Sequence, residues 1–264
     1  MRTLILVNTL QSVSSFVYSN HMAFATHTIR KFPDDKFFFF TPHRMTIDNA
    51  RNESAKMAMG MECDYLMFLD DDVLIPHDAF EVLVAAQKDI LAGFVYLRGY
   101  PFNKMIFREV KPETEQFQLT YYNDLPFVES CTEGHNKIEP GCVPCLTAKL
   151  VEIVPCDAVG FSCCLIKVDV IQAMEPPYFV TGPLNTEDVY FCLKTRGLDP
   201  QPTIAVHTGV RCGHMLNPEP IEYGTEQIHK VFYESLIKLQ SPAKQDPNPR
   251  NLDYILRNIK SLGS

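Results

Sequence analysis

The sequence predicts an α/β fold, a mostly parallel sheet sandwiched by helices, because short apolar segments alternate with helical patterns through its first hundred residues. The apolar segments have the length and the aromatic and β-branched content of strands. The expected strands are 3–8, 36–41, 64–70 and 89–97, and the expected helices between them are 13–31, 46–61 and 77–88. Sheets of this kind bind ligands in the crevice beyond the carboxyl ends of their strands.

The regular alternation stops after Arg98 and resumes near residue 150. Pro, Gly, Asn, Glu and Cys with scattered aromatic residues fill 99–150, which indicates an inserted region of loops and a hairpin. Beyond it we expect strands in LVEIVP and DAVGFSCCLI, a strand and then a turn in TIAVHTGVRCGHM, and helices near 168–174, 186–196 and 224–239. The sequence therefore predicts one domain over 1–240, followed over 241–264 by a Pro-rich linker and a terminal helical tail.

Composition limits the class of protein. The chain has 264 residues, of which 46% are hydrophobic, and its net charge of −8 argues against a broad surface for nucleic-acid phosphates. The apolar start at residues 4–7 is too short for a membrane span or a signal sequence, so we expect no span. Nine cysteines, an odd number with several in apolar runs, indicate free thiols in a reducing compartment, the cytoplasm.

Three consecutive aspartates carry the clearest chemical signal. Asp70, Asp71 and Asp72 follow the hydrophobic segment YLMFL at the expected end of a strand. Adjacent carboxylates repel one another, so their grouping requires a compensating cation. Oxygen ligands of this kind suit Mn²⁺ or Mg²⁺, which commonly bridge protein carboxylates and substrate phosphates. The alternative is a solvated turn in which an aspartate caps the next helix.

The order of motifs along the chain resembles that of the GT-A glycosyltransferases, in which a D-x-D motif ends a core strand. The segments IDNARNESAKMAMGMECDYLMFLDDD, AVGFSCCLI, NTED and VRCGHM follow the family's order over residues 3–215, with the insertion set aside. The chain is similar overall to small soluble glycosyltransferases of bacteria and phages. The resemblance implies a GT-A-like (Rossmann-like) fold and a divalent metal. It also implies a hexosyl or pentosyl group taken from a nucleotide-sugar, with a UDP-sugar expected first. A phage-encoded enzyme of this kind would act in the host cytoplasm.

The resemblance also assigns the metal ligands. Asp72 would ligate the metal, Asp70 would contact the donor's ribose or the metal through water, and Asp71 would point away. His214 in RCGHM matches the late histidine that many GT-A enzymes use as a metal ligand, and imidazole suits Mn²⁺ better than Mg²⁺. His207, one short strand earlier, is the competing histidine.

Donor contacts are expected at two further places. Arg51 and Asn52 are candidates for binding the nucleotide and its phosphates, since a guanidinium fork matches phosphate oxygens. The alternative puts both on a helix surface, with Asp48 paired to Arg51. The end of the first expected strand would approach the base through the backbone of Asn8, Thr9 and Leu10.

A second acidic pair, Glu187 and Asp188, lies in the helix expected at 186–196. By similarity to the family's E-D motif, Asp188 is the general base that takes the acceptor's proton, and Glu187 is the alternate. In a retaining enzyme the pair would bind sugar or acceptor hydroxyls instead. The alternative is structural: Asn185 caps the helix, and both acids complement its dipole.

The inserted region also holds a group of cysteines. Cys142-x-x-Cys145, with Cys131, His135 or Cys156 nearby, has ligands enough for a structural Zn²⁺. A single C-x-x-C motif is a weak signal, because the second pair of ligands is not specified, and free thiols are the competing interpretation.

The acceptor is expected to present a hydroxyl, in a glycan, a small molecule or a hydroxymethylated pyrimidine of phage DNA. Basic and aromatic residues alternate over 98–111, and we expect that stretch to govern the acceptor. Two other functions are alternatives. A metal-dependent nucleotidyltransferase usually has a Gly-rich basic phosphate loop, which the segment TLQSVSSF lacks. A non-catalytic nucleotide-binding module would not need both acidic groups and the late histidine together.

Overall fold

The computed structural model describes residues 1–9, 13–42, 44–112, 117–121, 131–134, 142–144, 152–182, 185–216, 219–222, 229, 230 and 234. Contacts between residues divide the chain into two units, Met1–Tyr223 and Gly224–Ser264. In the second unit the described residues His229, Lys230 and Glu234 are helical, as expected for 224–239. The predicted linker and tail over 241–264 lie outside the described residues. Everything that follows concerns the first unit.

The core of the first unit is a seven-stranded sheet in the order β2-β1-β3-β10-β5-β11-β8. Five of its strands run in one direction: β1 (Arg2–Asn8), β2 (Lys36–Phe40), β3 (Tyr65–Asp70), β5 (Ile90–Phe94) and β11 (Ile204–Arg211). The other two, β8 (Ile153–Pro155) and β10 (Cys163–Lys167), run antiparallel to their neighbours. The predicted α/β class and the mostly parallel sheet are confirmed.

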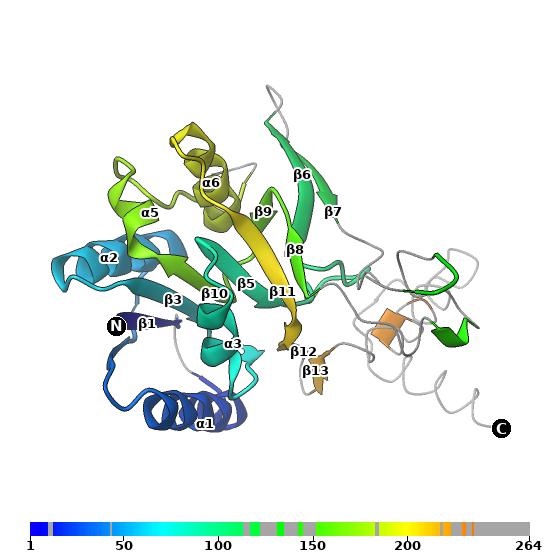
Figure 1. Cartoon of the computed structure of the whole chain (residues 1–264), viewed down its shortest axis with the longest axis horizontal. Helices are drawn as coiled ribbons and strands as arrows, with labels where there is room; N and C mark the ends of the chain where they lie inside the picture. The colour runs from blue at the N-terminus through cyan, green and yellow to red at the C-terminus, as the bar shows by residue number, and fades with distance from the viewer. Residues whose placement is uncertain are drawn as a thin grey trace, which may run out of the picture. The chain divides into compact units, whose positions relative to one another are not determined.

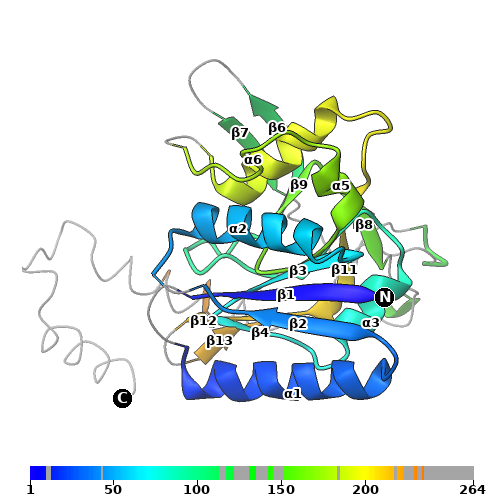
Figure 2. The ribbon, with the colours of Figure 1, turned by 90° about the vertical axis from the view of Figure 1, so that its left-hand side faces the viewer.

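Helices cover both faces of this sheet. Figure 2 shows α1 (Ser15–Lys31) on one side, where it contacts α3 (Ala79–Ala85). On the other side lie α2 (Ile47–Gly60), α5 (Val168–Gln172) and α6 (Glu187–Lys194), the last continued by the 3₁₀ turn η1 (Thr195–Gly197) (Figures 1 and 2). Fully buried side chains meet the sheet from both faces: Phe24 of α1 and Phe80 of α3 on one side, and Ala55 of α2 on the other. This three-layer arrangement removes apolar surface from water on both faces.

Two small sheets flank the large one. The strands β6 (Ile106–Pro112) and β7 (Phe117–Tyr121) form an antiparallel hairpin beside β9 (Ala158–Val159), which confirms a hairpin in the inserted region. The strands β4 (Val73–Leu74), β12 (Gly213–Leu216) and β13 (Glu219–Ile221) form the other small sheet. Two expectations were wrong here. DAVGFSCCLI is not one strand but divides into β9 and β10, and the turn expected after β11 is the strand β12.

Capping residues define where two of the helices begin. Ser14 caps α1 by accepting the Val17 N–H at 3.2 Å. The alternative in which Asn185 caps α6 is wrong, because the N-cap residue is Thr186. Five buried cysteines are free, which confirms the expected buried thiols: Cys63, Cys163, Cys164, Cys192 and Cys212. Within the described ranges, no helix has the length and apolar character to cross a membrane.

Candidate active site

A cavity of about 520 Å³ opens at the carboxyl ends of β1 and β3, the place that this topology favours for a ligand. Asn8 and Thr9 line it from the end of β1, and all three aspartates line it from the end of β3. His214 of β12 and Arg98, which follows β5, line it as well. The fold therefore brings the aspartates, the late histidine and the end of the first strand into one cavity.

The pairing of β4 with β12 brings His214 to Asp72. Val73 lies opposite His214 in this pairing, and the Met215 N–H donates to the Asp72 carbonyl at 2.8 Å. His214 Nδ1 lies 2.6 Å from the Tyr96 carbonyl oxygen. A carbonyl only accepts, so Nδ1 carries a proton, and Nε2 faces Asp72 Oδ1 at 3.4 Å. The register of two short strands thus places a carboxylate and an imidazole nitrogen side by side.

This pair fits the donor set of a divalent metal. Carboxylate oxygen together with imidazole nitrogen suits Mn²⁺, and a carbonyl behind the imidazole is the usual partner that orients a ligating histidine. Among the residues that the structure describes, no three His, Cys, Asp or Glu side chains are grouped so that they could hold a metal ion. A metal at Asp72 and His214 would therefore need further oxygen atoms from a bound ligand, as Mg²⁺ sites on nucleotide phosphates commonly do.

Arg98 makes a second contact to Asp72. Its guanidinium NH1 lies 2.9 Å from Asp72 Oδ2, on the oxygen that His214 does not face. Burial opposes ionisation of Asp72, but the hydrogen bond and charge of His214 and the charge of Arg98 hold the pKa of this carboxyl below its usual range. The sequence predicts that Arg98 contacts the acceptor, whereas in the structure it forms an ion pair with Asp72 in the cavity.

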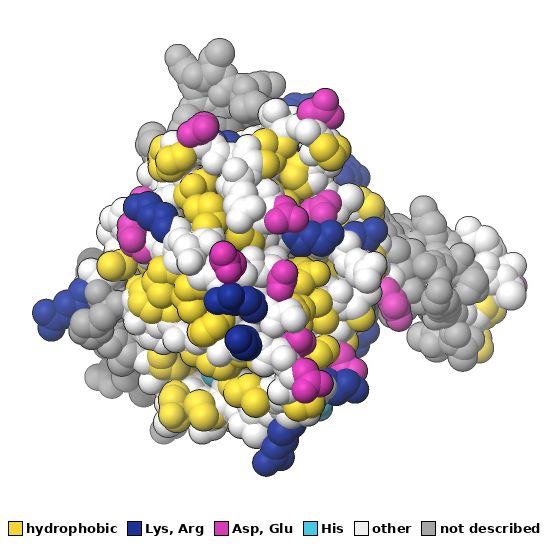
Figure 3. All heavy atoms as spheres, turned by 60° about the vertical axis from the view of Figure 1, so that its left-hand side comes forward, with side chains coloured by type: hydrophobic (Ala, Val, Ile, Leu, Met, Phe, Trp, Pro, Cys, Tyr) yellow, Lys and Arg dark blue, Asp and Glu magenta, His cyan; other side chains and the backbone are white. Residues whose placement is uncertain are grey.

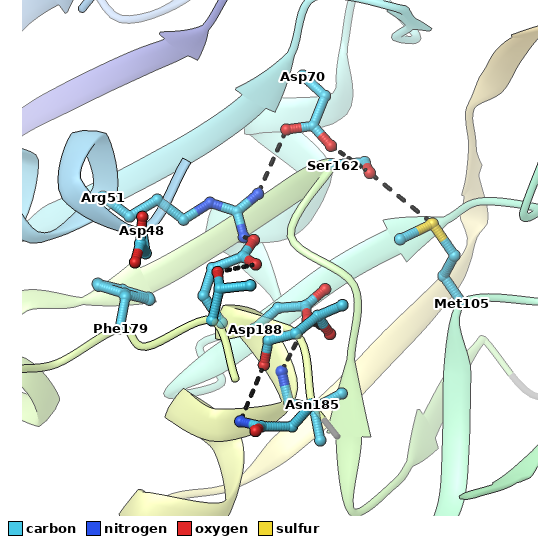
Figure 4. Close-up of polar contacts among 12 residues, drawn as sticks. Asp48, Arg51, Asp70, Met105, Ser162, Phe179, Asn185 and Asp188 are labelled. Atoms are coloured by element: carbon cyan, nitrogen blue, oxygen red, sulfur yellow. Dashed lines mark hydrogen bonds and ion pairs between the residues drawn. The ribbon is translucent and has the colours of Figure 1, made fainter. Parts of the chain in front are cut away.

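Asp70 belongs to a buried network that connects the two acidic groups. Arg51 NH2 lies 3.3 Å from Asp70 Oδ1, and Arg51 NH1 lies 2.5 Å from Glu187 Oε1. The other Asp70 oxygen accepts the Ser162 hydroxyl at 2.6 Å. Figure 4 shows Arg51 reaching from α2 toward Asp70 on one side and the start of α6 on the other. The network joins residues 136 positions apart in sequence.

Arg51 is the centre of that network and is only 1% exposed. Its guanidinium carbon lies 5.2 Å from the Phe68 ring centre and 5.4 Å from that of Phe161, within cation–π range. The alternative pairing with Asp48 on a helix surface is wrong, because Arg51 is buried and pairs with Asp70 and Glu187. A direct contact of Arg51 with the donor stays a prediction, and Arg51 does not line the cavity.

Asn52 is similarly occupied by the protein. Its amide nitrogen donates to the carbonyls of Asp48 and Phe179 at 2.9 and 2.7 Å, and its oxygen accepts the N–H groups of Tyr178 and Phe179. Asn52 therefore anchors the segment that leads from α5 to α6. Its predicted contact with the nucleotide remains a prediction.

Asn8 is a buried polar residue at the cavity and a candidate for binding a ligand. It is 7% exposed, lies opposite Asp70 in the β1–β3 pairing and lines the cavity. Neither its amide oxygen nor its amide nitrogen has a hydrogen-bond partner among the described residues. Buried amides are nearly always paired, and an unpaired one indicates a missing partner. The sequence predicts a backbone contact of Asn8 with the base, and the unpaired amide makes its side chain a second candidate for that contact.

The middle aspartate also lines the cavity. The resemblance implied that Asp71 points away, and its place in the cavity wall differs from that expectation. Burial raises the pKa of Asp71, which the Thr9 hydroxyl partly offsets. The neighbouring charges of Asp70 and Asp72 raise this pKa further, so the cavity is a place where a cation is needed.

Glu187 and Asp188 occupy the first turn of α6 and are 5% and 7% exposed. Asp188 accepts the Val189 N–H at 2.7 Å and the Thr186 hydroxyl, while Glu187 faces Arg51. Burial raises the pKa of Glu187, and the Arg51 charge opposes this shift. The two acids therefore differ: Glu187 is held in the Arg51 network, and Asp188 is held by its own helix turn. Neither lines the cavity at Asp72.

Three candidates are not tested by this geometry. Leu10 lies outside the described residues. His207 lies on β11, where its Nδ1 accepts the Gly209 N–H, and it does not line the cavity. The Sγ atoms of Cys131 and Cys142 are 3.8 Å apart, while His135 and Cys145 lie outside the described residues, so the zinc site stays a prediction.

Two residues that support the cavity had no sequence signal. Asn20 of α1 donates to the Ile75 carbonyl at 3.0 Å and accepts the Ile75 N–H at 2.7 Å. His21 Nε2 lies 2.9 Å from the Val73 carbonyl oxygen. Together they clip the segment that follows the aspartates, so α1 fixes the position of β4 and, through it, of His214. Polar residues inside a helix pattern do not reveal such a long-range role.

Comparisons with known proteins concern part of the sequence and the fold. Residues 24–142 match the family described as Glycosyl transferase family 2. The solved structure of A197 from STIV has 17% identity to this chain and a TM-score of 0.50, over 82% of this chain and 86% of that one. S. aureus TarS 1–349 has 11% identity and a TM-score of 0.36, over 94% of this chain and 68% of that one. No curated protein matches the chain.

The family match spans the aspartates, and the similarity to A197 concerns the fold. Together with the sheet order and the cavity at its carboxyl edge, they show that the chain shares the fold of A197 and that residues 24–142 are similar to glycosyl transferase family 2.

Proposed function

We propose that this protein transfers a hexosyl or pentosyl group from a nucleotide-sugar, first of all a UDP-sugar, to an acceptor hydroxyl, with a divalent metal. The observation that carries the proposal is the cavity itself, where Asp72 faces His214 Nε2 at 3.4 Å. The buried Asn8 lines the same cavity, and its amide has no hydrogen-bond partner in the described part of the chain. A carboxylate–imidazole pair suits the metal and its diphosphate, and an amide with both groups free suits the edge of a nucleobase.

Different residues of the cavity are proposed to bind the nucleoside and the metal. Asn8 and Thr9 would hold the nucleoside, and Asp72 and His214 would hold the metal. When bound, the metal would neutralise charge that develops on the leaving diphosphate. The bond between the anomeric carbon and the β-phosphate oxygen breaks with its electron pair on that oxygen, while the acceptor oxygen bonds to the carbon. Asp188 is the proposed base that takes the acceptor's proton.

The acceptor is proposed as a small molecule or a glycan rather than duplex DNA. On the face shown in Figure 3, acidic and basic side chains of the described residues are interspersed with hydrophobic ones. The chain carries a net charge of −8. Binding to duplex DNA needs several cations along one surface, since each neutralised phosphate adds to the affinity. The buried free thiols support a reducing compartment, the cytoplasm.

Donor binding is expected to require a divalent ion. The three carboxylates at the cavity repel a diphosphate unless a cation lies between them. We would titrate UDP, GDP, CDP and ADP calorimetrically with Mn²⁺ and again with excess chelator. The best ligand should lose about tenfold or more in affinity in chelator. Asp72→Asn should weaken binding only when Mn²⁺ is present. Equal affinity with and without metal would contradict the proposed metal site.

Asn8→Leu is expected to stabilise the protein and weaken nucleotide binding. Leucine has the same branching and number of side-chain heavy atoms, and its larger methyl groups can extend into the cavity that Asn8 lines. It removes a buried amide that has no partner among the described residues, so the free energy of unfolding should rise by about 1 kcal/mol or more. The same change removes the proposed contact to the base. Urea unfolding and calorimetry measure the two effects. The matched control is Asn20→Leu, whose amide is fully bonded to Ile75 and whose loss should destabilise. A destabilised Asn8→Leu with normal nucleotide affinity would contradict the assignment.

A further inference from the structure

We propose that Arg98 is a resident counter-ion of Asp72 that leaves this carboxylate when the metal binds and then binds the donor's diphosphate. The inference rests on the proposed function, because it needs a metal and a nucleotide at this cavity. It changes the expected role of Arg98 from an acceptor contact to a donor contact. It also explains how the protein tolerates its aspartate cluster in the absence of ligand.

The two partners of Asp72 differ in how firmly they are held. His214 is 7% exposed, and the Tyr96 carbonyl holds its ring at 2.6 Å. The Arg98 side chain is 56% exposed, and its guanidinium meets Asp72 Oδ2 at 2.9 Å. An exposed arginine changes rotamer at small cost, whereas a buried and hydrogen-bonded imidazole does not. Arg98 is therefore the partner that can move.

The backbone that carries Arg98 is anchored at the cavity. The Leu97 N–H donates to the Asn103 carbonyl at 2.7 Å, and the Phe102 N–H donates to the Gly99 carbonyl at 2.7 Å. Phe102 is 2% exposed, so its ring ties this turn to the interior. The start of the Arg98 side chain thus stays beside the cavity while its guanidinium is free to reach different positions in it. A diphosphate bound in the cavity would lie within the same space.

Charge supplies the reason for the exchange. A divalent ion on Asp72 would lie close to the Arg98 guanidinium, and like charges that share one carboxylate repel. The diphosphate brings negative charge into the cavity at the same moment. A guanidinium can bind two phosphate oxygens at once. Arg98 would therefore bind a diphosphate more strongly than it binds the single oxygen of Asp72. Arg98 would then neutralise the electron pair that the β-phosphate oxygen receives when its bond to the sugar breaks.

The test uses two affinities that should change in opposite directions. Mn²⁺ binding to Arg98→Ala without nucleotide is measured by electron paramagnetic resonance, and nucleoside diphosphate binding with Mn²⁺ by calorimetry. Removing the competing cation should tighten Mn²⁺ binding by about two- to fivefold. Removing the Arg98 guanidinium, which is proposed to bind the diphosphate, should weaken the binding of UDP by about tenfold or more. If another of the four nucleoside diphosphates binds more tightly than UDP, the same loss is expected for that nucleotide. The affinity for the nucleoside without phosphates should not change.

Two further variants make the result specific. Arg108→Ala removes the same charge from an exposed position on β6 and should leave both affinities unchanged. Arg98→Lys keeps the charge without the fork and should fall between the parent and Arg98→Ala for the diphosphate. If Arg98→Ala weakens or leaves unchanged the affinity for Mn²⁺, or binds the diphosphate like the parent, the exchange is overturned. If the parent binds no nucleoside diphosphate with Mn²⁺, the proposed function fails first, and Arg98 with it.

Discussion

Asp188→Asn is expected to slow sugar transfer by about 10²–10⁴-fold while leaving metal and donor affinity unchanged. The carboxylate is the only part of this residue that can take the acceptor's proton, and an amide of nearly equal shape cannot. The hydrogen bonds that hold Asp188, from the Val189 N–H and the Thr186 hydroxyl, can still reach the amide oxygen of asparagine. Single-turnover transfer and calorimetry with Mn²⁺ separate the chemical step from binding.

The matched control for this variant is Asp169→Asn. Asp169 holds the same second position of its helix, α5, as Asp188 does in α6, but it is exposed. The control therefore repeats the loss of a first-turn charge, worth a fraction of a kcal/mol, without touching the proposed base. Transfer by Asp188→Asn near the parent rate, with the same pH dependence, would make Asp188 a structural acid and contradict its proposed role as the base.

Arg51→Met is expected to have the largest effect on stability, a loss of about 3–5 kcal/mol in the free energy of unfolding. Arg51 is 1% exposed and pairs with both Asp70 and Glu187, so its removal leaves the buried Glu187 and the partly buried Asp70 without their cation. Urea unfolding measures the loss. Adding Glu187→Gln to Arg51→Met should recover part of it, because one of the unpaired charges is then gone. Equal stability of Arg51→Met and the parent would contradict a structural role for this network.

The pH dependence of Arg51→Met gives an independent check. Burial raises the pKa of Glu187 above its ordinary value, so the folded protein binds this proton more readily than the unfolded chain does. The contribution of Glu187 to stability therefore falls as the pH rises through its folded pKa. Loss of the Arg51 charge should raise that pKa further and widen the fall. As the pH falls through the raised pKa of Glu187 toward its ordinary value, Arg51→Met should regain stability relative to the parent, and it should lose that gain when Glu187→Gln is added.

Much of the fold was predictable because it depends on local patterns. The strands at 3–8, 36–41 and 64–70 and the helices at 13–31 and 46–61 lie within a few residues of β1, β2, β3, α1 and α2. Their apolar periodicity and capping residues are read from neighbouring positions. The errors occur where a strand's partner is distant in sequence, as in the division of DAVGFSCCLI and in β12.

The candidate site was predicted unevenly for the same reason. The sequence alone determined which residue types are present: an aspartate cluster that ends a hydrophobic strand, an acidic pair at a helix start, and a late histidine. Only the tertiary structure decided their partners. The β4–β12 register puts His214 on Asp72, and a buried guanidinium joins Asp70 to Glu187 across 136 positions. Such contacts arise when whole helices and strands pack together. Burial and charge pairing decide which side chains meet, and no short segment of the sequence shows these partners.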